Sequence, residues 1–270
     1  MPPATASQKQ SIAQFVALTD CTDSVASKFL RAAHWNIDRA IDRYKSTQVY
    51  CHLSPALTTF RANMNLAFKD ESNEEAAVIS IEGAIRFLED INVQLDEVTC
   101  LGVMELCKCP TMGEFPRESF VAGWKETKCD TLPKMAEYAN QLRSRIPTDK
   151  DLFRRVYCHT FPISRMAGQR NLPYDLAAEQ WRLLFTADRG GVPWSTASTP
   201  WLEWWLEFLE ERGKKAVSKD LWQQLELFVR KTKEDESFGW WSVDAAWPGT
   251  LDDFVGWVQE KRAQGNAMEL

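Results

Sequence analysis

Apolar residues recur every three to four positions along most of this chain, which is the spacing of one face of an α-helix. Between residues 7 and 46 the pattern predicts three short helices, and Asn36, which follows a break at Trp35, is of the type that caps the third. We expect one small domain here, close to the lower size limit for a core without disulfides or metals. The apolar positions expected on the inner faces are Ile12, Phe15, Val16, Val25, Phe29, Leu30, Ile37, Ala40, Ile41 and Tyr44.

After a predicted linker at residues 47–56, a second pattern recurs. A short extended stretch is followed by a polar or proline cap and an amphipathic helix, with an acidic residue in the first turn where the helix dipole favours it. No alternating run is long enough to predict a sheet. The chain is therefore predicted to be all-α, with a three-helix domain at 7–46, a larger helical domain at 57–262 and a tail at 263–270. The pattern begins at Ile79, Glu114, Val217 and Ala246.

These helix starts resemble the second halves of EF-hand units, in which a calcium-binding loop joins two helices. In a loop counted from Asp70, however, the sixth position holds Glu75 instead of the glycine that makes the turn. The twelfth position holds Ile81 instead of the bidentate glutamate. We expect EF-hand-like helix-loop-helix units without calcium, and a calcium-responsive adaptor stays open as an alternative.

The charge balance narrows the possible partners. The chain carries 32 Lys and Arg against 38 Asp and Glu, a net charge of -6. An acidic protein repels nucleic acid and anionic lipid, so neither is expected as a partner, and a basic protein partner fits better. No stretch approaches the roughly 18 apolar residues of a membrane helix, and the first residues resemble no export signal. We expect the protein in the cytoplasm, the nucleus or both.

Tryptophan is unusually frequent, with 12 residues in the chain. Ten of them lie between Trp181 and Trp257. Their size favours a helical core filled by large rings, and the alternative is that some rings anchor a protein partner. The segment 186–200 interrupts the helices and is rich in Gly, Pro, Ser and Thr, which predicts a surface loop.

The chemistry of enzymes is poorly represented in the chain. There is no phosphate-binding glycine loop and no serine-hydrolase or zinc-protease motif. The seven cysteines are irregularly spaced and only three histidines occur, so we expect no cofactor and no metal. Cys158 and His159 are neighbours, but successive residues of a helix point about 100° apart. Asp252 and Asp253 suit a helix start better than an acid–base pair. These patterns favour a binding protein over an enzyme.

The stretch Asp244-Ala-Ala-Trp-Pro-Gly-Thr-Leu-Asp-Asp-Phe-Val255 resembles the signature of the potentiating-neddylation domain of the defective in cullin neddylation family. Three further segments are similar to that domain, and residues 7–46 resemble a ubiquitin-associated (UBA) domain, in the order typical of the family. The three segments are Ile79-Ser-Ile-Glu-Gly83, Glu114-Phe-Pro-Arg-Glu-Ser-Phe120 and Ser218-Lys-Asp-Leu-Trp222.

The resemblance implies a scaffold-type E3 ligase without catalytic residues. Such a protein binds the neddylation E2 and the C-terminal winged-helix domain of a cullin together, so that proximity speeds transfer to the acceptor lysine. Matched by motif, the cullin-binding residues are Asp220, Ala246 and Asp252, whose carboxylates accept from Lys or Arg. The plainer interpretation is that Asp220 and Asp252 only cap helices. A helical adaptor with another partner and a cysteine-dependent enzyme of the ubiquitin system are the alternative functions.

The family resemblance also implies a pocket for the N-terminally acetylated methionine of the E2, because acetylation removes a charge that burial would have to desolvate. Cys107 and Gln180 stand where we expect aromatic residues in animal relatives, which predicts a reshaped pocket. A ubiquitin-type partner would meet Leu18 and Thr19, in a loop after the first helix, and the third helix near Ile41 and Tyr44. The implied pocket residues are Ile81, Ala84, Cys100, Leu101, Val103, Met104, Phe115, Ile163 and Leu183, with backbone groups of Met112 and Gly113 for the acetyl amide.

Overall fold

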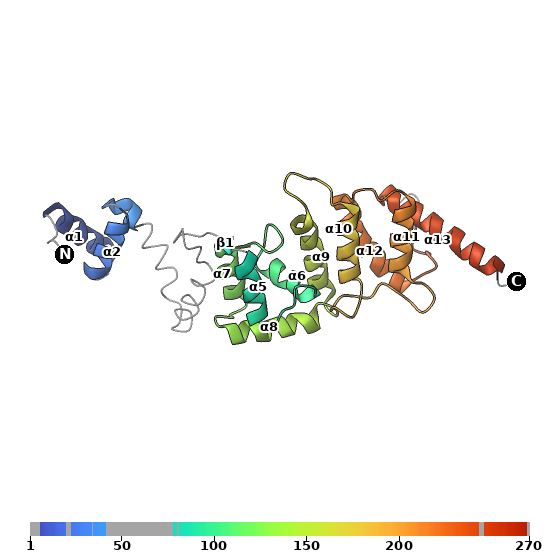
Figure 1. Ribbon diagram of the computed structural model, residues 1–270, viewed down its shortest axis with the longest axis horizontal. Helices are drawn as coiled ribbons and strands as arrows, with labels where there is room; N and C mark the ends of the chain where they lie inside the picture. Colours follow the sequence, from blue (N-terminus) through green and yellow to red (C-terminus); the bar gives the residue numbers. More distant parts are fainter. Residues whose placement is uncertain are drawn as a thin grey trace. The chain divides into compact units, whose positions relative to one another are not determined.

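The computed structural model describes residues 6–19, 23–33, 35–41, 78–79, 81–242 and 246–268. The chain divides into two compact units, Met1–Arg61 and Ala62–Leu270, each with its own apolar core. Regular structure in these ranges is almost entirely helical, as the apolar spacing predicts (Figure 1). The predicted linker at 47–56 lies outside the described residues.

The Met1–Arg61 unit contains α1 (Ala6–Thr19), α2 (Asp23–Ala32) and a further helical stretch at 37–41. Asn36 caps that stretch as predicted, because its Oδ1 accepts a hydrogen bond from the backbone N–H of Arg39 at 3.0 Å. The predicted inner faces meet in one small core. Its buried residues are Phe15, Ala26, Leu30, Ala33 and Ala40, with Ile12, Val16, Trp35, Ile37 and Ile41 packed against them.

One boundary in this unit differs from the prediction. The sequence predicts a loop at Leu18 and Thr19, whereas α1 continues through Thr19. No glycine or proline interrupts the helix there, so its hydrogen bonding extends to that residue. Tyr44 and the side chains of Val25 and Phe29 lie outside the described residues.

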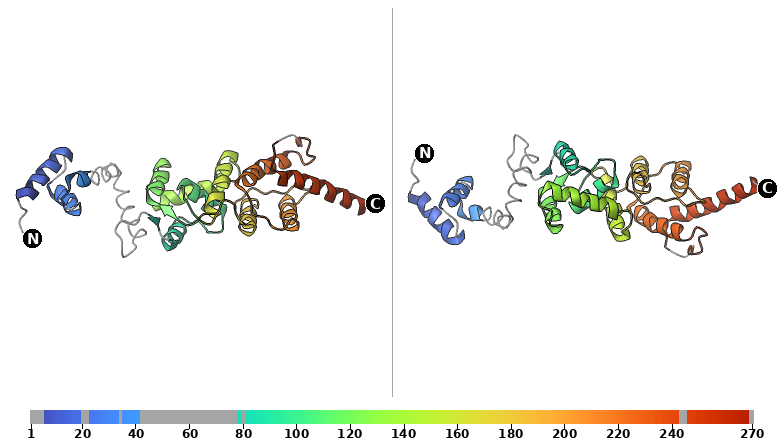
Figure 2. Two further views of the ribbon diagram at one scale, coloured as in Figure 1. Left: turned by 90° about the horizontal axis from the view of Figure 1, so that it is seen from above. Right: turned by 90° about the horizontal axis from the view of Figure 1, so that it is seen from below.

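The Ala62–Leu270 unit is arranged around a central helix, α9 (Lys150–Ser164), which contacts α6 (Val98–Leu106), α10 (Tyr174–Leu184) and α12 (Lys219–Glu234). Helices α5 to α8 lie on one side of α9, and α10 to α13 lie on the other (Figures 1 and 2). The remaining elements are β1 (Val78–Ile79), α5 (Ile81–Asp90), β2 (Phe115–Pro116), α7 (Arg117–Glu126), α8 (Leu132–Arg145), α11 (Trp201–Glu211) and α13 (Gly249–Met268).

Short extended segments precede four helices of this unit and pair in two sets. β1 and β2 are antiparallel, with Ile79 opposite Phe115, just before α5 and α7. Leu172 and Val217 form a second antiparallel bridge just before α10 and α12. The predicted acidic residue is present in the first turns of α5, α7, α12 and α13, and α10 shares this pattern although the sequence did not single it out. The EF-hand-like interpretation of these units stays a prediction.

Tryptophan rings form the centre of the unit, which confirms the core interpretation. Trp222 stacks on Trp181 and Tyr157, with ring centroids 5.4 and 4.7 Å apart. The Trp222 indole N–H donates to the Tyr157 carbonyl oxygen at 2.9 Å, and the Tyr157 hydroxyl donates to the Trp222 carbonyl oxygen at 2.8 Å. These bonds satisfy polar groups that burial removes from water. The fully buried indoles are Trp124, Trp181, Trp194, Trp201, Trp205 and Trp222.

The segment 186–200 is only in part the surface loop that its composition predicts. Trp194 within it is buried and packs against Phe228 and Phe254. The Trp194 indole N–H donates to the buried Thr232 hydroxyl at 2.9 Å. Trp194 therefore holds the segment against the core together with the buried Thr199, whose hydroxyl donates to Glu236 at 2.8 Å.

Candidate partner-binding surfaces

The residues implied for cullin binding lie at the starts of α12 and α13. Asp220 is exposed in the first turn of α12, and Asp252 is half-buried in the first turn of α13. Ala246 is exposed in the segment before α13. All three are therefore at least partly accessible to a partner.

Asp220 is not the cap of its helix. The cap of α12 is Ser218, whose Oγ accepts from the backbone N–H of Leu221 at 3.1 Å. The plainer interpretation of Asp220 as a helix cap is therefore wrong. Its carboxylate favours the helix start only through the dipole.

Asp252 and Asp253 are neighbours with different surroundings. Asp253 forms an ion pair with Arg212 at 2.5 Å. Asp252 Oδ1 is buried and accepts no hydrogen bond from a described residue. An unsatisfied buried oxygen is costly, so the surroundings of Asp252 are less favourable than those of the paired Asp253.

The fold brings these helix starts to one end of the C-terminal helices. The Arg212–Asp253 pair joins the end of α11 to the first turn of α13. Residues 213–217 lead from that pair directly into the cap of α12, and α12 and α13 contact each other (Figure 2). The residues 243–245 before Ala246 lie outside the described part of the chain.

Most residues of the implied E2 pocket belong to the apolar interior around α5, α6, β2 and α9. The backbone N–H of Met112 donates to the Ile163 carbonyl oxygen at 3.1 Å, which joins the loop before β2 to the end of α9. The Met112 N–H is therefore not available for the acetyl amide of a partner. Gly113 has a positive φ of 78°, a turn conformation that favours glycine. The buried members are Ala84, Cys100, Leu101, Val103, Met104, Phe115 and Ile163.

Apolar side chains reach the surface beside this interior. Ile81 is 60% exposed at the start of α5, and Met112 is 40% exposed. Val78 of β1 and Met166, just after α9, are exposed as well. Exposed large apolar residues grouped near one pair of strands are typical of an interaction surface.

Leu183 has different surroundings from the other implied pocket residues. It lines a hollow between α10 and α11, and none of the other ten implied pocket residues lines that hollow. The two replacement positions are also interior. Cys107 is fully buried beside Trp124, and Gln180 is half-buried on α10.

The neighbouring thiol and imidazole of Cys158 and His159 are not activated. Burial raises the pKa of the Cys158 thiol, which disfavours the thiolate. Burial also lowers the pKa of His159, so its imidazole is held neutral. Cys100, a member of the implied pocket, and Cys109 are even less reactive, because burial raises the pKa of each thiol to about 12.

Neither a metal centre nor a membrane span is found in the described part of the chain. Within the described residues, no three His, Cys, Asp or Glu side chains are grouped to hold a metal ion. Of the helices that the structure describes, none is long and apolar enough to span a membrane.

In the N-terminal unit, the residues implied for ubiquitin binding are only partly described. Leu18 is 59% exposed at the end of α1, while Ile41 packs against the core. The Thr19 side chain and Tyr44 lie outside the described residues. Leu18 is therefore the one implied contact that the structure presents to solvent among those it describes.

The fold defines a helical protein with a small three-helix domain before a larger helical one in the sequence. Residues 9–44 match the family model described as a UBA-like domain, and residues 134–257 match the model described as cullin binding. The chain belongs to the family of defective in cullin neddylation protein 1, which confirms the resemblance seen in its motifs.

Three relatives of that name illustrate the match. The protein of Pyricularia oryzae is 31% identical over 268 residues, which cover 96% of this chain and 95% of the relative. The protein of Yarrowia lipolytica is 30% identical over 251 residues, covering 93% and 97%. The protein of Saccharomyces cerevisiae is 24% identical over 263 residues, covering 94% and 95%.

Proposed function

We propose that this protein promotes cullin neddylation as a scaffold that contributes no catalytic residue. It binds the winged-helix domain of a cullin and the neddylation E2 at the same time, and proximity then speeds transfer. The observation that carries the proposal is Asp252, which lies half-buried inside the cullin-binding match and, unlike the adjacent Asp253, forms no ion pair with a described cation.

The cullin surface is formed by Asp220, Ala246 and Asp252. The two carboxylates receive Lys or Arg side chains of the cullin, and the small Ala246 side chain leaves room for close approach. Asp253 has no such role, because Arg212 already pairs with it. Of the two adjacent aspartates, only Asp252 therefore belongs to the proposed cullin surface.

Calorimetric titration with a cullin winged-helix domain tests this surface. We expect Asp252→Lys and Asp220→Lys each to weaken binding at least about tenfold. Each change replaces a hydrogen-bond acceptor with a cation that repels the Lys or Arg side chains of the cullin. The matched control is Asp175→Lys, which makes the same change at the second residue of α10, as Asp220 is the second residue of α12. Wild-type affinity in Asp252→Lys, with its fold intact by circular dichroism, would contradict the proposal.

The E2 surface is the apolar region of α5, α6, β2 and α9. Exposed Ile81 and Met112 lie at its edge, and the buried side chains behind them accept the acetylated methionine. Cys107 is packed into the core beside Trp124, so the pocket differs there from one lined by an aromatic ring.

A peptide of the E2 N-terminus, with and without its acetyl group, tests the second surface by fluorescence anisotropy. We expect Ile81→Arg to weaken binding of the acetylated peptide about tenfold. An Ile side chain that becomes buried on binding contributes about 1.5–3 kcal/mol. Leu95→Arg is the control, because Leu95 is 55% exposed, similar to Ile81 at 60%, but lies outside the proposed pocket. Equal binding of the acetylated and free-amine peptides to the wild type would remove the acetyl-methionine pocket and leave the cullin surface untouched.

A further inference from the structure

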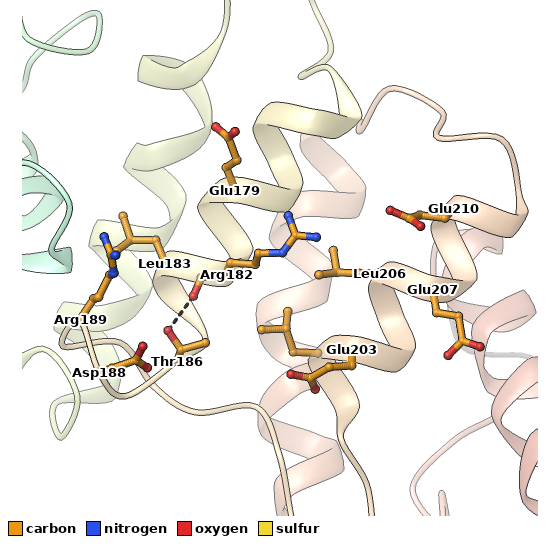
Figure 3. A pocket seen from close by; sticks show the side chains of 11 residues that line it. Glu179, Arg182, Leu183, Thr186, Asp188, Arg189, Glu203, Leu206, Glu207 and Glu210 are labelled. Atoms are coloured by element: carbon orange, nitrogen blue, oxygen red, sulfur yellow. Dashed lines mark hydrogen bonds between the residues drawn. The ribbon is translucent and has the colours of Figure 1, made fainter.

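An open groove runs between α10 and α11, in the same unit as the two surfaces proposed above. Its volume is about 790 Å³, within the range of about 300–1,000 Å³ typical of ligand sites (Figure 3). None of Asp220, Ala246 and Asp252 lines it, and Leu183 is its single residue in common with the implied E2 pocket.

The floor of the groove is aliphatic. Leu202 and Leu206 of α11 form it, whereas Leu183 lines the groove from α10 with its side chain on the side turned away from Leu206 (Figure 3). Leu202 and Leu206 are almost buried, so they offer a shallow apolar surface and no deep cavity. Such a floor accepts one or two aliphatic side chains of a ligand.

The walls of the groove are acidic. Glu203, Glu207 and Glu210 follow one face of α11 at the spacing of successive helical turns, and Glu179 lines the groove from α10. With Asp188 the groove has five carboxylates against two guanidinium groups, those of Arg182 and Arg189. The excess of negative charge predicts a cationic ligand.

Some of these charges are already paired within the chain. Glu207 pairs with Lys261, Glu210 pairs with Lys214 at 3.3 Å, and Arg189 pairs with Asp96. A second group consists of exposed carboxylates that have none of the described cations within ion-pair distance, and these are available to a partner. They are Glu179, Asp188 and Glu203.

Arg182 gives the groove a donor at its centre. Its guanidinium extends from α10 over the floor toward Leu206 (Figure 3). Across the part of the chain that the structure describes, no carboxylate is within ion-pair distance of it. It can therefore donate to the carbonyl oxygens or the C-terminal end of a bound segment, which orients that segment.

We propose that this groove binds a basic amphipathic helix of a protein partner. Lysine or arginine side chains on successive turns of that helix pair with Glu203 and Glu179, and an aliphatic face rests on Leu202 and Leu206. Cations at positions i, i+4 and i+7 of the ligand lie on successive turns, so that one of them reaches Glu203 while Glu207 and Glu210 keep their pairs with Lys261 and Lys214. This site goes beyond the proposed function and does not rest on it.

Fluorescence anisotropy with the full-length protein tests the groove. The probe is a labelled helical peptide of about 14 residues, or four turns, with lysine at i, i+4 and i+7 and leucine on the adjoining face. A second peptide carries glutamate in place of each lysine. We expect the lysine peptide to bind with a dissociation constant on the order of 10 µM and the glutamate peptide at least about tenfold more weakly.

The variant pair separates the groove from the net charge of the protein. We expect E179K/E203K to weaken binding of the lysine peptide about tenfold. The control E126K/E137K makes the same change in charge on exposed positions of α7 and α8 and should alter binding by less than about twofold. If the lysine variant does not fold, E179Q/E203Q keeps the side-chain shape and should weaken binding in the same direction.

Three results would overturn the groove: no binding of the lysine peptide to the wild type, unchanged binding by E179K/E203K, or an equal loss in the control. The two proposals also fail separately. E179K/E203K should bind the cullin domain like the wild type, and Asp252→Lys should bind the lysine peptide like the wild type.

Discussion

At the scale of single residues, side chains of the same type differ because of what surrounds them. Asp253 is paired with Arg212, whereas the adjacent Asp252 has a buried oxygen that no described residue satisfies. Glu226 is a third case, buried on α12 with Arg230 2.8 Å from one carboxylate oxygen and Arg154 3.4 Å from the other. The surroundings therefore decide which carboxylate is paired at the surface, which is left without a described cation and which is part of the core.

Glu226 leads to a prediction about pH. Burial raises the pKa of its carboxyl above the ordinary 4.5, although Arg230 and Arg154 oppose the shift. The folded chain then holds a proton that the unfolded chain has lost, so the free energy of unfolding falls as pH rises through the window above 4.5. Because glutamine does not titrate, the wild type should lose stability relative to Glu226→Gln across this window.

Urea unfolding of both proteins over a pH series measures that difference. Glu137→Gln, on an exposed position of α8, controls for the removal of a carboxylate in general. A difference between wild type and Glu226→Gln that stays constant, or grows in favour of the wild type, would contradict the raised pKa.

At the scale of elements, local signals set where helices start, and contacts set how connections run. Ser218 caps α12 and Asn36 caps the stretch at 37–41, as their residue types predict. The segment 186–200 follows a different rule, because Trp194 and the close approach of Gly191 to α10 hold it in place. A side chain at Gly191 would place its Cβ 2.5 Å from the carbonyl oxygens of Leu184 and Thr186.

Gly191→Ala should therefore lower the free energy of unfolding by about 1–3 kcal/mol, the usual cost of overpacking. Gly256→Ala is the control, since its Cβ would meet no atom within 4 Å and the residue lies within α13. That change should leave stability unchanged or raise it by up to about 1 kcal/mol, because alanine favours a helix. Urea denaturation followed by circular dichroism measures both changes. A Gly191→Ala variant as stable as the wild type would show that the segment 186–200 moves to accommodate the methyl group at little cost.

At the scale of the whole molecule, the two compact units divide the proposed tasks. Both proposed surfaces and the groove lie in the Ala62–Leu270 unit, which has its own tryptophan-rich core. The Met1–Arg61 unit has a separate core and presents Leu18 to solvent. Binding of the cullin should therefore not require the UBA-like domain.

Residues 62–270 alone should bind the cullin winged-helix domain within about twofold of the full chain by calorimetric titration. Addition of free ubiquitin should change neither affinity, because its proposed contacts lie in the other unit. A large loss of affinity in the shorter chain would show that the N-terminal unit takes part in cullin binding.

The sequence by itself determined the helical class, the caps at Asn36 and Ser218, the acidic first turns and the family, because each depends on a few neighbouring residues. Only the tertiary structure decided which distant residues meet: Arg212 with Asp253, Leu172 with Val217, and α10 with α11 across an acidic groove. Apolar periodicity shows that a helix has a buried face, but not which helix covers it, since packing partners are chosen by contacts far apart in the chain.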